Sequence, residues 1–90
     1  MRYFILDKRR DSEGVLYTFP SGDTAGFIRE LRHGEAVTWK VEPKDSGMPE
    51  WIFHEYRAAE AYMNAAAYEF VSTTDMGHLL TSKRRKNVLQ

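Results

Sequence analysis

The residues that could carry out covalent or metal chemistry are few and poorly spaced in this chain. It contains no Cys, which excludes thiol nucleophiles, Cys-ligated zinc and disulfides. The chain has neither a Gly-x-Ser-x-Gly turn nor a Ser-x-x-Lys pair. Ser82 and Lys83 are adjacent, so they do not have the three-residue separation that such a pair requires. His33, His54 and His78 lie 21 and 24 residues apart, without the close spacing typical of metal ligands. The sequence therefore predicts a protein that is not an enzyme, with no metal site and no cofactor.

Two further patterns have plainer structural explanations. The segment 22–26 has a glycine at each end and precedes an expected helix, whose N-terminus would attract an anion. Asp23 would repel phosphate, and it serves better as a helix N-cap. Four glutamates could in principle supply acid–base chemistry, but nothing places two of them in an apolar pocket, so we expect them to be solvated: Glu50, Glu55, Glu60 and Glu69.

Charge is balanced over the whole chain but is unevenly distributed along it. Thirteen basic and thirteen acidic residues give a formal net charge of +0, which argues against a basic nucleic-acid arm or an acidic DNA mimic as the whole protein. From Glu50 to Asp75 five acids accompany one base, Arg57. Basic runs occur at Lys8–Arg10 and at the C-terminal residues Lys83, Arg84, Arg85 and Lys86. These runs could bind nucleic acid through its phosphates, or the C-terminal run could be a solubilising tail.

The aromatic content favours protein binding. Five Phe, five Tyr and two Trp are more rings than so small a core is expected to hide, and Tyr, Trp and Arg are enriched at interface hot spots. The alternative is that both Trp residues are core and that Tyr68 exposes only its hydroxyl. We predict a partner-binding surface on the outer face of a helix, with three outlying contacts, made of Tyr68, Glu60, Asn64, Arg57, Arg9, Arg10 and Trp51.

The first half of the chain predicts two strands, a helix and a third strand. Residues 2–7 are apolar at both parities, which is typical of a central strand, and 8–14 are expected to form a hairpin loop before a strand over 15–19. Ala25, Ile28 and Leu31 recur at helical spacing and predict a helix over 23–33, ended by Gly34. Alternation predicts a half-buried strand over 37–41.

The second half predicts a hairpin and a long helix. A turn-rich loop over 43–49 separates the strand 37–41 from a strand over 51–56, so the two Trp-bearing segments should pair; the alternative is a helix that begins as early as Glu50. The clearest helix covers 57–71, with Ala59, Met63 and Ala66 on its inner face. Beyond it we expect a short helix through Met76, or an edge strand over 78–82.

The predicted class is α+β, with a four-stranded, mostly antiparallel sheet, two or three helices on one face, and the other face only partly covered. We expect a single domain over 1–82 and a basic tail over 83–90, together a complete gene product. No run approaches the length of a membrane span or a signal peptide. The prediction is therefore a cytoplasmic protein that does not bind membranes and in which a homodimer is not excluded.

In layout, the chain resembles the small anti-CRISPR proteins of bacteriophages and mobile elements. The resemblance lies in the early strand Tyr3–Leu6, the charged loop Asp7–Gly14 and the ββαββα order; no residue motif is shared, so no functional residue is transferred. It implies a phage-type inhibitor that acts in the bacterial host cell. Such a protein would bind and block a host CRISPR–Cas complex, for example one Cas subunit, without DNA mimicry.

Overall fold

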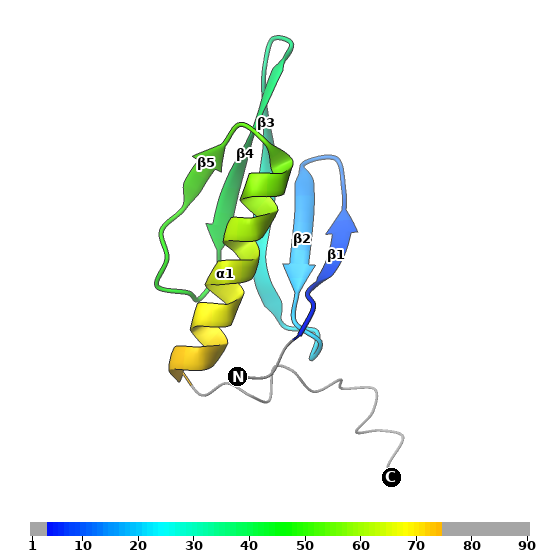
Figure 1. Cartoon of the computed structure of the whole chain (residues 1–90). Coiled ribbons are helices and arrows are strands. Elements are labelled where there is room, and N and C mark those ends of the chain that lie inside the picture. The colour runs from blue at the N-terminus through cyan, green and yellow to red at the C-terminus, as the bar shows by residue number, and fades with distance from the viewer. Residues whose placement is uncertain (1–3, 75–90) are drawn as a thin grey trace.

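The computed structural model describes residues 4–74, which form one antiparallel sheet and one helix (Figure 1). The sheet order follows the chain order, so each strand pairs with its sequence neighbours. The helix lies across one face of the sheet. The elements are β1 (Asp7–Arg10), β2 (Gly14–Thr18), β3 (Thr24–His33), β4 (Ala36–Pro43), β5 (Trp51–Phe53) and α1 (Tyr56–Thr74).

Short turns with the appropriate residues connect the first four strands. Between β1 and β2, the Asp11 carboxylate accepts hydrogen bonds from the backbone N–H groups of Glu13 and Gly14, at 2.8 and 3.0 Å. The turn between β3 and β4 contains Gly34, whose φ of 66° lies in the left-handed region that glycine adopts without steric cost. Each connection is too short to cross the sheet, and an antiparallel meander results.

The core lies between α1 and the face of the sheet that it covers. From the sheet, Val15, Ile28 and Val41 are opposite one another in the register of β2, β3 and β4, and all three are buried. The helix contributes a buried stripe in which small residues allow close approach to the strands: Ala59, Met63, Ala66, Ala67 and Val71. This packing fixes which side chains of α1 lie beside the sheet edges.

Several sequence predictions are confirmed. The α+β class with an antiparallel sheet is observed, and β2, β4 and α1 fall close to the predicted ranges. The two Trp-bearing segments do form a hairpin, with Trp39 opposite Phe53, although β5 has only three residues and α1 begins at Tyr56. No described element packs on the second face of the sheet, where Leu16 and Phe27 are half-buried.

The predicted helix over 23–33 is wrong: Thr24–His33 is β3, the longest strand. Ile28 faces the helix and Leu31 the opposite side, so the apolar residues serve two faces of a strand rather than one stripe of a helix. β3 pairs with β2 over Thr24–Arg29 and with β4 over Gly26–His33, and this pairing overrides the local helical spacing. Ser21 and Asp23 accordingly form the turn between β2 and β3, where the Ser21 hydroxyl donates to the Asp23 carboxylate at 2.8 Å.

The N-terminal assignments are also wrong. The first strand is not a central strand over 2–7 but the edge strand β1, and Lys8–Arg10 belong to it rather than to a hairpin loop. Phe4 and Leu6 precede the strand and pack against the core instead. All four residues of β1 are exposed, and charges on an edge strand oppose unwanted pairing.

The described part of the chain has five strands and one helix, where four strands and two or three helices were predicted. The short helix or edge strand predicted after Thr74, and the tail 83–90, lie outside the described residues. Within residues 4–74 no helix is long and apolar enough to cross a membrane.

Candidate protein-binding groove

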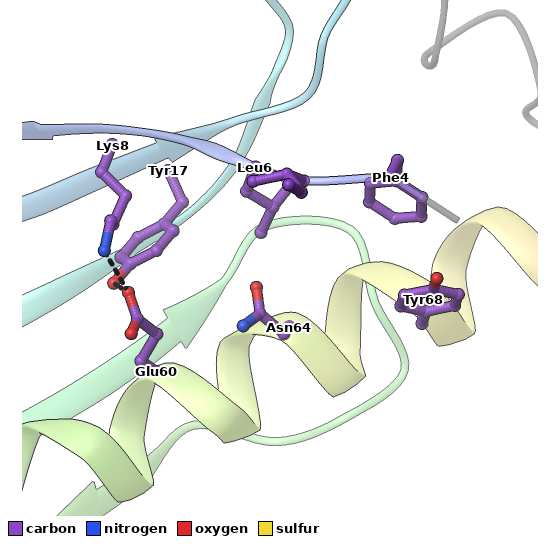
Figure 2. Close-up of a pocket in the computed structure, with 8 residues that line it drawn as sticks. Phe4, Leu6, Lys8, Tyr17, Glu60, Asn64 and Tyr68 are labelled. Carbon is purple, nitrogen blue, oxygen red and sulfur yellow. Dashed lines mark hydrogen bonds and ion pairs between the residues drawn. The ribbon is translucent and has the colours of Figure 1, made fainter. Parts of the chain in front are cut away.

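Three of the predicted contact residues line one groove. Glu60, Asn64 and Tyr68 follow one side of α1, and residues 4–8 run beside them on the way into β1 (Figure 2). The groove has a volume of about 260 Å³. We call it the Glu60 groove, and its lining is Phe4, Ile5, Leu6, Lys8, Tyr17, Glu60, Asn64 and Tyr68.

The polar end of the groove is organised around the Glu60 carboxylate. Its Oε2 atom lies 2.8 Å from the Lys8 ammonium and accepts a hydrogen bond of 2.8 Å from the Tyr17 hydroxyl. The Tyr17 hydroxyl also hydrogen-bonds to the hydroxyl of Tyr56, at the start of α1. Tyr17 is buried and Glu60 is half-buried, so the network ties β1 and β2 to the helix.

Each perturbed pKa in this network stabilises the ordinary ionisation state of its group. The hydrogen bond from Lys8 lowers the pKa of Glu60, and the same bond raises the pKa of Lys8. Burial, with the bonds to Tyr56 and Glu60, raises the pKa of Tyr17. A general acid or base works best with a pKa near the operating pH. These shifts move all three pKa values further from pH 7. The three groups therefore keep their protonation states at that pH, which suits binding better than proton transfer.

The apolar end of the groove is formed by rings and aliphatic side chains. The Phe4 and Tyr68 rings stack with centroids 4.7 Å apart and an interplanar angle of 27°. Leu6 is buried beside them, whereas Ile5 is 69% exposed. An exposed isoleucine next to an apolar cavity gives a partner side chain two surfaces to contact.

Asn64 lies between the two ends. Its exposed side chain points from α1 toward the segment that contains Leu6 (Figure 2). The structure of residues 4–74 shows no hydrogen bond to its amide. A free amide presents both a donor and an acceptor, which is the pair of groups that a peptide bond of an extended chain also presents.

The other predicted contacts are dispersed. Arg57 is exposed at the start of α1, outside the groove lining. Arg10 is in β1, 2.9 Å from the Glu30 carboxylate, and its guanidinium lies over the Trp39 ring, 5.8 Å from its centroid. Arg9 is exposed in β1, and Trp51 is 58% exposed in β5 at the opposite edge of the sheet. The predicted surface is therefore one groove and two separate sheet edges.

The N-terminal half of the groove was missed by sequence reasoning. Phe4, Leu6 and Tyr17 were assigned to strands, and Lys8 to a loop. The Lys8–Glu60 pair spans 52 residues of sequence, and no local spacing indicates such a contact.

The remaining candidate sites gain no support from residues 4–74. No group of three or more His, Asp or Glu residues that could hold a metal ion occurs among them. The basic residues Lys83, Arg84, Arg85 and Lys86 lie outside the described part. Residues 4–74 contain eight basic and twelve acidic residues, so the described domain has an excess of negative charge.

The fold and the groove define a small α+β domain, a five-stranded meander with one helix, which carries a mixed polar and apolar groove. Comparison with protein-family models, with curated proteins and with solved structures gave no match.

The Glu60 network predicts a pH dependence of stability. Because the pKa of folded Glu60 is lowered, its contribution is complete above the ordinary pKa of 4.5 and is lost as the pH falls through the folded value. We expect Glu60→Gln to lower the free energy of unfolding at pH 7 by about 1 kcal/mol, a modest loss because the partner Lys8 is largely exposed. In urea titrations the difference from wild type should shrink below pH 4.5.

Glu55→Gln is the matched control, because Glu55 is exposed and makes no ion pair in the described structure. Its difference from wild type should stay small at each pH. At high pH, Lys8 and Tyr17 affect stability instead. Because their pKa values are raised, their contributions to the free energy of unfolding are lost as the pH rises above about 10. A Glu60→Gln deficit that is unchanged at pH 3 would contradict the network.

Proposed function

We propose that this protein is a binding module that holds an extended segment of another protein in the Glu60 groove. The observation that carries the proposal is the free Asn64 amide between an apolar cavity and an ion-paired end. An extended peptide needs hydrogen bonds for its backbone and pockets for alternate side chains. The amide suits the former, and the space beside Phe4, Leu6 and Tyr68 suits an apolar side chain.

The charges at the polar end restrict which segment fits. Lys8 and Glu60 already neutralise each other at 2.8 Å, so a charged partner side chain would have to displace one of them. We therefore expect the bound segment to be neutral and to carry one large apolar residue. The pKa values of Lys8, Tyr17 and Glu60 are all shifted away from pH 7, so none of these groups would exchange a proton readily at that pH. This supports a non-enzymatic role.

The wider prediction, that the partner belongs to a host CRISPR–Cas complex, rests on the layout resemblance. The ββαββα order that supported it is replaced by βββββα, so the identity of the partner stays a prediction. The alternative of nucleic-acid binding is weakened for residues 4–74, since Lys8 and Arg10 of the basic β1 are in ion pairs. For the run Lys83–Lys86 it also stays a prediction.

Affinity capture with matched variants tests the proposal. Tagged wild type, Asn64→Arg and Ala61→Arg would be incubated with a nuclease-treated bacterial lysate, and bound proteins quantified by mass spectrometry. Ala61 is exposed on α1 but lies outside the groove lining, so it controls for an added arginine. We expect a stoichiometric protein with wild type and Ala61→Arg, and at least about tenfold less with Asn64→Arg, the loss typical of an interface hot spot.

Two results would contradict the proposal. One is equal recovery of the same protein by Asn64→Arg and wild type, which would place the contact elsewhere. The other is recovery of DNA or RNA alone from a lysate without nuclease, which would favour the nucleic-acid alternative. Circular dichroism of each variant before capture establishes that α1 is retained.

A further inference from the structure

The two edges of the sheet differ in chemistry. β1 consists of four exposed charged residues, Asp7 to Arg10, and such charges prevent edge-to-edge pairing. β5 at the other edge has the sequence Trp-Ile-Phe, without charge, proline or a break in its register with β4. Trp51 is 58% and Ile52 52% exposed. Only the β1 edge is therefore protected by charge against the addition of another strand, and β5 is protected only by its length of three residues.

The outer side of β5 presents backbone groups that can pair. β5 is the last strand in the sheet order, and β4 pairs with its inner side only. In an antiparallel strand, alternate residues direct both backbone groups to the same side. No hydrogen bond to the outer side of Trp51–Phe53 occurs in the described structure, so this edge is open to a further strand.

The side chains around Ile52 are self-complementary. If a second copy pairs its β5 antiparallel to the first, with Ile52 opposite Ile52, then Trp51 of each copy lies opposite Phe53 of the other. Trp51 and Phe53 share the face covered by α1, since they are opposite Val41 and Trp39. The same register places the acidic side chain of Glu50 opposite the basic side chain of His54, so these two residues do not repel each other.

We propose that this protein forms a symmetric homodimer through its β5 edges, in the register that pairs Ile52 with Ile52. The two-fold axis runs perpendicular to the sheet, so two five-stranded sheets become one continuous sheet with both helices on the same face. β1 and β5 lie at opposite edges of the sheet (Figure 1). The Glu60 groove is lined by residues that lead into β1, so it stays free in each copy. The dimer would therefore present two grooves to its partners.

The paired edge is short, so the dimer should be weak. Pro49 and Glu55 flank the five residues that could pair, and the Pro49 carbonyl is occupied by the Tyr62 hydroxyl at 2.6 Å. Such a contact is smaller than the roughly 800 Å² per partner of a standard interface, and we expect half-dimerisation at concentrations on the order of 10–100 μM.

A charge-swap experiment tests both the edge and the register. Sedimentation velocity of the full chain from 5 to about 500 μM would compare wild type, Ile52→Lys, Ile52→Glu, and their equimolar mixture. Like charges opposite each other at the two-fold axis should weaken each variant's dimer at least tenfold. Opposite charges in the mixture should restore dimerisation. Ile5→Lys is the control, because Ile5 is even more exposed than Ile52, at 69% against 52%, but lies at the groove.

A monomeric wild type at 500 μM would overturn the proposal, as would an Ile52→Lys protein that dimerises like wild type. Failure of the mixture to dimerise would overturn the register. Thermal melts of the variants check that the sheet is intact. Ile5→Lys should dimerise like wild type, so loss of partner binding in Ile5→Lys and loss of dimerisation in Ile52→Lys would be independent results.

Discussion

Replacing Gly14 with alanine is expected to lower the free energy of unfolding by about 3 kcal/mol or more, a large part of the total stability of a domain of this size. Gly14 is buried at the start of β2, opposite Arg29 of β3. A Cβ atom there would lie 2.1 Å from the Ile28 carbonyl oxygen and 3.0 Å from Arg29 Cα. Both are backbone atoms, so the clash is relieved only if β2 and β3 separate.

Urea denaturation followed by tryptophan fluorescence would measure this loss. Gly47→Ala is the control, because its added Cβ meets only the Glu69 carboxylate, at an ordinary 3.7 Å. We expect Gly47→Ala to stay within about 0.5 kcal/mol of wild type. A Gly14→Ala protein as stable as the control would show that the two strands approach each other less closely than described.

The parts of the fold that could be predicted from sequence are those specified by neighbouring residues. The alanine-rich helix α1 and the alternation around Trp39 are local patterns, and both were found. β3 was not, because Ala25, Ile28 and Leu31 fit a helical stripe equally well. Its strand conformation depends on β2 and β4 pairing on either side, and this information is not contained in the segment itself.

The same distinction applies to the groove. Helical periodicity correctly placed Glu60, Asn64 and Tyr68 on one side of α1. What gives them a site is the segment 4–8, which lies beside the helix because β1 is an edge strand. The sheet order therefore decides whether these three residues lie on an open helix face or form one wall of a groove. That order could not be derived once β3 was read as a helix.

Met63→Ala is expected to lower the free energy of unfolding by about 3 kcal/mol, within the range for a large core side chain that is cut to alanine. Met63 is fully buried in the middle of α1. It packs on Gly26 of β3, so closely that a Cβ at Gly26 would lie 2.7 Å from Met63 Cε. Removal of its thioether chain would leave a cavity between helix and sheet. The neighbouring Asn64→Ala, at an exposed position, should change the stability by less than about 0.5 kcal/mol.

The Gly26–Met63 contact also predicts how the two positions combine. Gly26→Ala alone should destabilise the domain, because the new methyl group meets Met63 and also lies 2.8 Å from the Glu42 carbonyl oxygen. In the double variant the methyl group occupies space that Met63 has vacated. The total loss should therefore be smaller than the sum of the single losses by about 1 kcal/mol. The contact with the Glu42 backbone is not relieved, so stability should not return to that of Met63→Ala. Strict additivity in urea denaturation would contradict direct packing of Met63 on Gly26.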